Sequence, residues 1–455
     1  MSETTNKTAN KIAKTNIKNM TVGDPMKLIV AYFLPVLGST IFQQLYGIVD
    51  SIIVGKGIDD YALAAVGNTG SIMFFIFGFV MGLASGMSVL MAQAFGAKDY
   101  DRLKKTITMG FLACGIVTIS IMVLSLIFIG DILLLLKTPE EIMAQSRLYI
   151  VIILVGLPLT FLYNCSSAML NSLGDSKTPL GAVILASAIN VVLDILFIFV
   201  CKMGVEGAAI GTLIAQLFSL IFNFVHLRKI SYIKLKRSDF ELDFGLIFNV
   251  IKIGVPVAFM NSITAIGCLL LQYFVNDLGI ICTSAYSACM RISQFLVQPS
   301  TAVGITINTY AGQNYGAKRI DRIKNGINSA LMLSLIITAI GSVLLIFAPK
   351  MLASIMLTDS EIIDVAAGYL VIRGVMHWSI CLLFLYRGTL QGMGFTFVPM
   401  ISGILELLAR VVVSVLLVKR MGFDAIALAE VSAFFSALAL NYIYLQFRLR
   451  GLEKG

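Results

Sequence analysis

The sequence predicts an all-α integral membrane protein of about twelve transmembrane helices, arranged as two copies of a six-helix unit. Three observations predict it. The 455 residues are 58% hydrophobic and 13% charged, with a mean hydropathy of +0.91. The apolar residues fall in long runs, and the second half of the chain repeats motifs of the first. Soluble domains average about 25% charged residues, so most of this protein's surface must face something other than water.

The apolar runs are long enough to cross the hydrocarbon core of a bilayer, which is about 30 Å thick and takes roughly 20 helical residues. In the first half they lie near residues 28–54, 61–93, 106–130, 143–165, 178–201 and 204–227. In the second half they lie near residues 246–276, 280–311, 326–348, 362–386, 395–418 and 423–447. Backbone polar groups find no water inside the bilayer, so each run must be a helix or part of a closed barrel. The length of the runs selects helices.

The basic residues predict which side of the membrane each loop faces. If the N-terminus is cytoplasmic, 24 of the 34 Lys and Arg residues lie in inner segments and seven in outer ones. The positive-inside rule then predicts a multi-pass protein with both termini in the cytoplasm. The predicted division is a tail (1–26), an N-lobe (27–228), a cytoplasmic linker (229–245), a C-lobe (246–450) and a second tail (451–455).

An internal repeat relates the two halves. Residues 93–98 read Gln-Ala-Phe-Gly-Ala-Lys, and residues 313–318, displaced by 220 positions, read Gln-Asn-Tyr-Gly-Ala-Lys. At the same offset Gly174 meets Gly394, and several other positions also match. Six crossings per half is an even number, so the halves share one topology and are related by a pseudo-two-fold axis along the membrane normal. Such repeats are typical of secondary transporters.

Two carboxylates lie deep inside apolar runs of the first half. Asp50 is in the first run and Asp194 in the fifth, with Asn190 one helical turn before Asp194 on the same face. Thr212, in the sixth run, can complete a polar pocket. A charge at the bilayer centre costs at least ~2.5 kcal/mol, so these residues need a reason to be there. Each Asp can simply hydrogen-bond a neighbouring helix, but two in one repeat favour a site that exchanges protons or holds Na⁺.

The second half carries different polar residues at the matching positions. Arg410 and Ser414 correspond to Asn190 and Asp194, and Glu406 precedes Arg410 by four residues, so that the two can neutralise each other. This asymmetry favours a cation site in the first half only. A polar site in the second half, or a set of structural pairs, is predicted from Arg291, Arg373, Glu406 and Arg410.

Backbone features of the runs suggest where the helices bend and pack. Pro35 and Pro256 lie inside equivalent helices and should kink them, either as hinges or as static bends. Two glycine series have the small-xxx-small spacing that lets helices approach closely: Gly78, Gly82 and Gly86, and Gly204, Gly207 and Gly211.

The sequence argues against several function classes. Basic residues lie in short loops, which does not suggest nucleic-acid binding, and the seven cysteines have no paired or metal-ligand spacing. The two histidines form no metal or nucleophile motif, so we do not expect an enzyme. We expect no cofactor, no metal beyond a Na⁺ at Asp50 and Asp194, and a protein that functions as a monomer among membrane lipids.

Taken together, the motifs resemble the multidrug and toxic compound extrusion (MATE) family over roughly residues 20–450. The matching segments are residues 43–46 (Gln-Gln-Leu-Tyr) with Asp50 and Gly55, 62–67 (Ala-Leu-Ala-Ala-Val-Gly), Gln93 with Gly96 and Ala97, 174–179 (Gly-Asp-Ser-Lys-Thr-Pro), 312–317 (Gly-Gln-Asn-Tyr-Gly-Ala) and 390–394 (Leu-Gln-Gly-Met-Gly). The combination is specific, unlike any single segment.

The resemblance implies two six-helix lobes in a V around a central cavity. It also implies export of organic, mostly lipophilic cationic compounds across the plasma membrane in exchange for H⁺ or Na⁺. Asp50, Asn190, Asp194 and Thr212 match the cation pocket of the DinF-like branch. The acidic C-lobe residues of the NorM-like branch are missing. A lipid-linked oligosaccharide flippase of the same superfamily, whose cavity tends to be basic, is the alternative, because of Arg291, Arg373 and Arg410.

Overall fold

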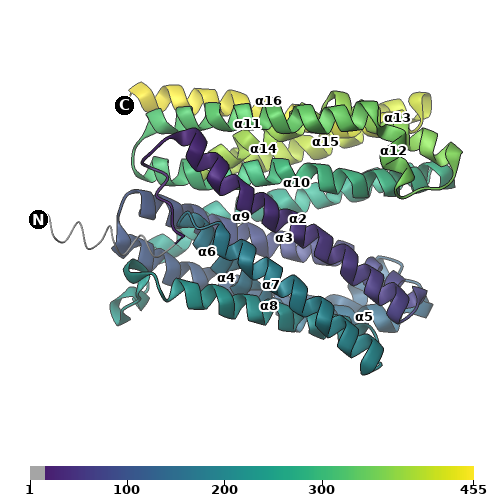
Figure 1. Cartoon of the computed structure of the whole chain (residues 1–455), viewed down its shortest axis with the longest axis horizontal. Helices are drawn as coiled ribbons and strands as arrows, with labels where there is room; N and C mark the ends of the chain where they lie inside the picture. Colours follow the sequence, from purple (N-terminus) through teal and green to yellow (C-terminus); the bar gives the residue numbers. More distant parts are fainter. Residues whose placement is uncertain (1–15, 455) are drawn as a thin grey trace, which may run out of the picture. The chain divides into compact units, whose positions relative to one another are not determined.

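The structure is a computed structural model that describes residues 16–454, apart from the side chains of residues 60, 71 and 454. Most of the predicted N-terminal tail thus lies outside the described residues. The first half contains α2 (Pro25–Gly57), α3 (Asp60–Gly96), α4 (Tyr100–Leu135), α5 (Glu140–Val155), α6 (Leu157–Ser172), α7 (Lys177–Asp194), the π-helix η1 (Ile195–Val200) and α8 (Val205–Leu227) (Figure 1).

The second half follows two short 3₁₀ turns, η2 (Ser231–Ile233) and η3 (Arg237–Phe240). Its helices are α9 (Phe244–Asn276), α10 (Ile280–Gly316), α11 (Ile320–Phe347), α12 (Pro349–Ser354), α13 (Ser360–Val375), α14 (His377–Gly392), α15 (Phe397–Met421) and α16 (Asp424–Lys454). The last helix continues through most of the segment predicted as a C-terminal tail.

Ten of these helices, counting α7 with η1 as one, are long and apolar enough to cross a membrane, and two bent pairs bring the number to twelve. The bent pairs are α5 with α6, at 51°, and α13 with α14, at 49°. The sequence predicted one uninterrupted run in each place. Pro158 explains the first break, because proline has no N–H to donate and its ring clashes with the preceding turn. The second break, at Met376, has no proline.

The repeat is present in the backbone itself. Each of α3, α5 and α6 begins and ends 220 residues before α10, α13 and α14, respectively. The turns match as well: Lys98 and Lys318 both have positive φ, at 59° and 56°, and Gly174 and Gly394 have φ of 87° and 88°. Corresponding amides close these turns, for example Ala97 N to Gln93 O at 2.9 Å and Ala317 N to Gln313 O at 3.0 Å. The repeat predicted from short motifs is therefore confirmed in the conformation of each half.

Contacts divide the chain into two compact units, which are described separately below. Unit 1 holds described residues 16–19 and 34–258, and unit 2 holds residues 20–33 and 259–454. The changes between units inside α2 and α9 fall within three residues of Pro35 and Pro256. The lobe boundaries given above follow the chain rather than contacts, and they stay a prediction.

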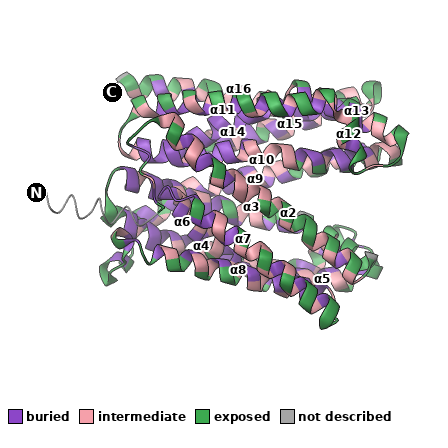
Figure 2. Cartoon of the chain, viewed as in Figure 1, coloured by how far each residue is buried: buried purple, intermediate pink, exposed green. Residues whose placement is uncertain are grey.

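The surface of the helices is apolar in a way that suits lipid rather than water. Large side chains such as Leu135 and Phe347 are more than 80% exposed, and many others line the outer faces of the helices. Figure 2 shows exposed and intermediate residues along each helix and buried ones inside each unit. Soluble monomers rarely expose such extensive apolar patches.

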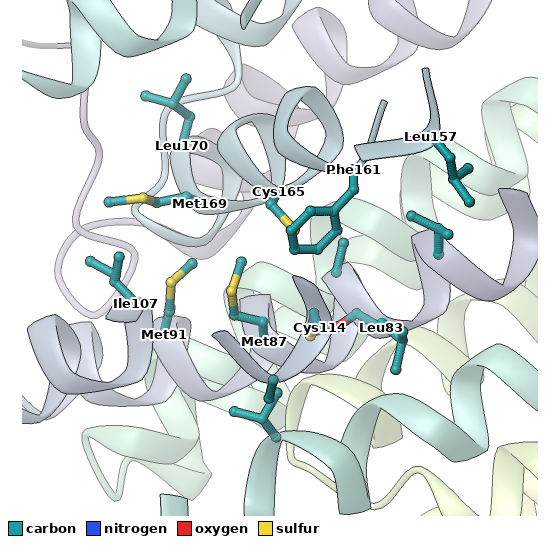
Figure 3. Packing of buried hydrophobic residues seen from close by; sticks show 14 of the residues in the cluster. Leu83, Met87, Met91, Ile107, Cys114, Leu157, Phe161, Cys165, Met169 and Leu170 are labelled. Carbon is teal, nitrogen blue, oxygen red and sulfur yellow. Dashed lines mark hydrogen bonds between the residues drawn. The ribbon is translucent and has the colours of Figure 1, made fainter. Parts of the chain in front are cut away.

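The core of unit 1 is built mainly from α3, α4 and α6. Met87 and Met91 of α3, Ile107 and Cys114 of α4, and Phe161 of α6 are among its buried members (Figure 3). The charged linker also packs here, because Ile230 and Ile233 are buried in the same cluster and the Thr108 hydroxyl donates to the Asp239 carbonyl. This packing holds α5, α7 and α8 against a rigid base, which positions the site described next.

Candidate functional site

The four residues predicted as a cation pocket come together inside unit 1. Asp50 lies on α2, Asn190 and Asp194 on α7, and Thr212 on α8. Asn190 and Asp194 are completely buried. The carboxyl groups of Asp50 and Asp194 lie within hydrogen-bonding reach of each other. Residues separated by more than 140 positions in sequence therefore form one polar pocket.

Asn190 connects the members of this pocket. Its Nδ2 donates to Asp194 Oδ1 at 3.3 Å and to Thr212 Oγ1 at 3.4 Å. The Thr212 hydroxyl is also 3.2 Å from the hydroxyl of Tyr46, one turn before Asp50 on α2. The network thus links α2, α7 and α8, and moving any one of these helices must break a contact.

Three oxygens of the pocket have no hydrogen-bond partner. They are Asp50 Oδ1, Asp194 Oδ2 and Asn190 Oδ1, and each is buried. Buried acceptors are almost always satisfied in folded proteins, and each exception calls for an explanation. Two neighbouring carboxylates also cannot both stay ionised without a proton or a cation between them. Carboxylate and amide oxygens are ligands that hard cations prefer.

Gly211 makes room for the Asp194 carboxyl. A Cβ at position 211 would lie 2.6 Å from Asp194 Oδ1. The sequence assigned this glycine to helix packing alone, and its spacing gave no sign of the contact with Asp194.

Gly211→Ala is therefore expected to displace the carboxyl and reduce transport by about tenfold or more, since small misplacements of reacting groups have effects of this size. Efflux measured per folded molecule checks this. Gly47→Ala is the matched control, because nothing lies within 4 Å of a Cβ there. Equal efflux in the two variants would contradict the role given to Gly211.

Asp194 sits where the helix changes its winding. α7 ends at this residue and η1 continues as a π-helix, in which the Cys201 amide bonds to the Leu196 carbonyl at 2.9 Å. π-turns are rare and frequently mark functional sites. Ile198 of η1 is buried with Val54 of α2 and Val205 of α8, so the turn is packed firmly beside the pocket.

Two tyrosines of the site were not predicted as such. Tyr46 bonds to Thr212, and Tyr149 of α5 lies within electrostatic range of both Asp50 and Asp194. The i, i+4 spacing of Tyr46 and Asp50 was the available signal for the first. Nothing in the local sequence around Tyr149 indicated the second.

The polar residues predicted in the second half are only partly brought together. In unit 2, Glu406 lies 3.6 Å from Arg410 as predicted, and it also pairs with Arg387 of α14. Arg387 is buried, so counting it among the cytoplasmic loop residues was wrong. Arg373 pairs with Glu430 of α16, which the sequence did not single out.

Arg291 does not join this group. It is exposed on α10, and no ion pair is formed by it among the described residues. A polar site that includes Arg291 is therefore not formed in unit 2.

The glycines of α3 confirm the predicted close packing. A Cβ on Gly82 would lie 2.4 Å from the backbone of Ala258, and one on Gly86 would lie 2.3 Å from that of Gly254. Both contacts are within unit 1 and flank Pro256 of α9. Helices α2 and α9 continue through their prolines, and a hinge at Pro35 or Pro256 stays a prediction.

No group of three or more His, Cys, Asp or Glu side chains in the described part of the chain is placed to hold a metal ion. The pocket around Asp50 and Asp194 falls outside that definition, because its remaining oxygens come from an amide and hydroxyls.

Comparison with known proteins gives a consistent result. The MatE family profile matches residues 35–196 and 256–416, one match in each half. The chain is 29% identical to the probable multidrug resistance protein YoeA of Bacillus subtilis over 349 residues, which is 75% of each protein. It is 25% identical to the probable multidrug resistance protein NorM of Thermotoga maritima, over 86% of each.

Solved structures show the same fold. A crystal structure of a MATE protein in complex with MaL6 superposes with a TM-score of 0.90 at 20% identity, over 96% of this chain and 99% of the other. A multidrug resistance MATE family transporter in an outward-facing conformation gives 0.89 at 22% identity, over 97% and 100%. The twelve-helix fold predicted from the sequence is confirmed.

Proposed function

Because this chain belongs to the MatE family of transporters, we propose that it is a secondary active antiporter that exports organic, mostly lipophilic cationic compounds in exchange for H⁺ or Na⁺. The observation that carries the proposal is the set of three unpartnered, buried oxygens on Asp50, Asn190 and Asp194. Two relatives named as multidrug resistance proteins support the substrate class. The assignment to the DinF-like branch stays a prediction, supported by the same pocket.

The pocket can couple an ion to a movement of α2. Asp50 and Tyr46 are on α2, whereas their partners Asp194 and Thr212 are on α7 and α8. A proton or Na⁺ between the carboxyls draws the three helices together, and its loss lets like charges push α2 away. A ligand shifts a conformational equilibrium only by its differential affinity for the two states. The ion supplies that difference here, and Pro35 is where α2 would bend.

The coupling cation and a cationic substrate compete through charge. When the pocket is filled, the negative charge that favours a cation nearby is removed, so the substrate is released. One pH unit of gradient supplies about 1.36 kcal/mol per proton, which sustains about a tenfold substrate gradient. Export then follows when the ion enters from outside, across the plasma membrane.

The proposed orientation places both termini in the cytoplasm. Single cysteines introduced in a cysteine-free background as Tyr100→Cys and Ile320→Cys are expected to react with impermeant reagents from the cytoplasmic side. Ile58→Cys and Ser360→Cys are expected to react from outside, because they sit at the opposite ends of the spans. External labelling at position 100 would overturn the orientation. Labelling of positions 100 and 320 from opposite sides would overturn the parallel repeat.

The test of the function is uptake by inverted membrane vesicles under an imposed gradient. A lipophilic fluorescent cation is expected to accumulate when protons or Na⁺ are more concentrated in the lumen, and to stop when that gradient is collapsed. Uptake that persists without either gradient, or that strictly requires ATP, would rule out antiport. If the only transported species is an anionic lipid-linked sugar, the flippase alternative replaces this proposal.

A further inference from the structure

The buried charges of unit 2 do not balance. Three arginines, Arg373, Arg387 and Arg410, lie in its interior with side chains no more than 10% exposed. Only two carboxylates, Glu406 and Glu430, are buried among the described residues of this unit. His377 is buried there too, but it contributes no negative charge. The interior therefore carries one positive charge more than its carboxylates can neutralise.

The two carboxylates are already committed. Glu406 pairs with Arg387 through Oε1 and lies 3.6 Å from Arg410 through Oε2. Glu430 pairs with Arg373 and accepts a hydrogen bond from the Tyr369 hydroxyl at 2.6 Å. Neither glutamate has an oxygen left for another arginine.

Arg410 is the arginine with unsatisfied donors. Its Nε and Nη1 have no hydrogen-bond partner although the residue is 2% exposed. Guanidinium donors are normally satisfied when buried, because leaving a charged donor unpaired costs its full desolvation. Nη1 faces α9 at Gly267, where a Cβ would lie 2.4 Å from it, so the absence of a side chain there is what admits it.

A second cation lies on the other side of a shared aromatic ring. The guanidinium of Arg410 is 5.7 Å from the centroid of Phe434, and that of Arg373 is 5.9 Å from the same centroid. Elsewhere in the series arginine and glutamate alternate, but here two arginines follow each other with no carboxylate between them. Cys268 of α9 lies within electrostatic range of both arginines and both glutamates, so the groups form one cluster.

Two hydroxyl groups beside the cluster are also unpartnered. Ser414 is one turn after Arg410 on the same face of α15, and its Oγ is buried without a hydrogen bond. The Tyr286 hydroxyl is likewise buried without one, and it lies within electrostatic range of Arg373 and Arg410. Unsatisfied donors from two helices thus surround the excess positive charge.

We propose that this cluster binds one monovalent anion beside Arg410, either a halide ion or a carboxylate carried by a transported molecule. An unpaired ion in a low-dielectric interior is strongly unfavourable, and a counter-ion with hydrogen bonds to its donors relieves that. The anion would accept from Arg410 Nε or Nη1 and would separate Arg410 from Arg373. Unit 2 then carries a site for negative charge at the repeat position where unit 1 has Asp194, since Ser414 follows Asp194 by 220 residues.

The test measures the thermal unfolding midpoint of the purified full-length protein by the fluorescence of its one tryptophan. Trp378 lies in unit 2 with its ring 6.2 Å from that of Phe435, next to the ring shared by the two arginines. Chloride, bromide, formate and benzoate are each titrated at constant ionic strength against the bulkier isethionate. A ligand that binds only the folded state raises the midpoint as its concentration exceeds its Kd.

Three variants locate the effect. Arg410→Gln leaves two arginines and two glutamates, so the anion-dependent rise in the midpoint should be lost, or the apparent affinity should fall by about tenfold or more. Arg291→Gln makes the same change of charge at an exposed position and should keep the wild-type response. Ser414→Asp supplies a fixed negative charge, so this variant should be more stable than wild type without added anion and insensitive to it.

The outcomes separate the two sources of the anion. A rise with chloride or bromide identifies a halide site, and a rise with formate or benzoate alone identifies a carboxylate site. If no anion raises the wild-type midpoint, or if Arg410→Gln responds like wild type, the proposal is overturned. Should Ser414→Asp fail to fold, the comparison of Arg410→Gln with Arg291→Gln decides alone.

Discussion

Asp50→Asn and Asp194→Asn are each expected to reduce ion-driven efflux to the level of membranes without the protein. The carboxyls lie within hydrogen-bonding reach of each other and have unpartnered oxygens, so they act as one site. Removing either leaves a site that cannot exchange its charge. The double variant should then be no worse than each single one, because groups that work as a unit are not additive.

Both variants should remain folded. Asn is nearly isosteric with Asp, and it removes a charge that is costly to bury in a membrane protein. Folded yield and the unfolding midpoint are measured beside transport, with Asp131→Asn on the exposed face of α4 as the control. Normal efflux in both single variants would remove the pocket from the mechanism.

Glu406→Gln is expected to have the largest effect on stability. It leaves Arg387 and Arg410 without their shared carboxylate in a site where Glu406 is 1% exposed. Removing one partner of a buried ion pair typically costs about 3–5 kcal/mol, because the remaining charge stays buried and uncompensated. The measurement is the unfolding midpoint in detergent, together with the folded yield.

Glu453→Gln is the matched control for this change. Glu453 pairs with Lys324, but both side chains are more than a third exposed. Surface pairs contribute about 0–1 kcal/mol, so this variant should behave nearly like wild type. Similar midpoints for Glu406→Gln and Glu453→Gln would contradict the assignment of Glu406 as a structural anchor of unit 2.

The sequence predicted the helices well because lipid imposes a simple rule. A long apolar run must be a helix, whatever its neighbours are. The breaks at Gly156 and Met376 were missed for the opposite reason. Both pieces of each pair are apolar, so hydropathy alone does not distinguish a bent span from a straight one. Pro158 was a usable signal for the first break, and the repeat would have transferred it to the second.

The acidic pocket was predictable because buried carboxylates are rare in membrane helices, and Asp50 and Asp194 stand out against an apolar background. Residues that act through packing could not be found this way. Gly211 is one of many glycines, and its contact with Asp194 depends on how α7 and α8 cross. The partners of the arginines were equally hidden, because Glu430 is more than 50 residues from Arg373 and joins it only through the fold.

Exchange of an ion for a substrate at the acidic pocket is the central claim, and luminal ion release in inverted vesicles tests it most directly. The vesicles are preloaded with protons or Na⁺, and a lipophilic cation is added outside while the luminal ion is followed with a trapped dye. Wild-type protein is expected to release the luminal ion when the substrate is added, and Asp194→Asn is expected to release none. Release that is the same in wild type and Asp194→Asn, or substrate uptake with no release of either ion, would contradict the account.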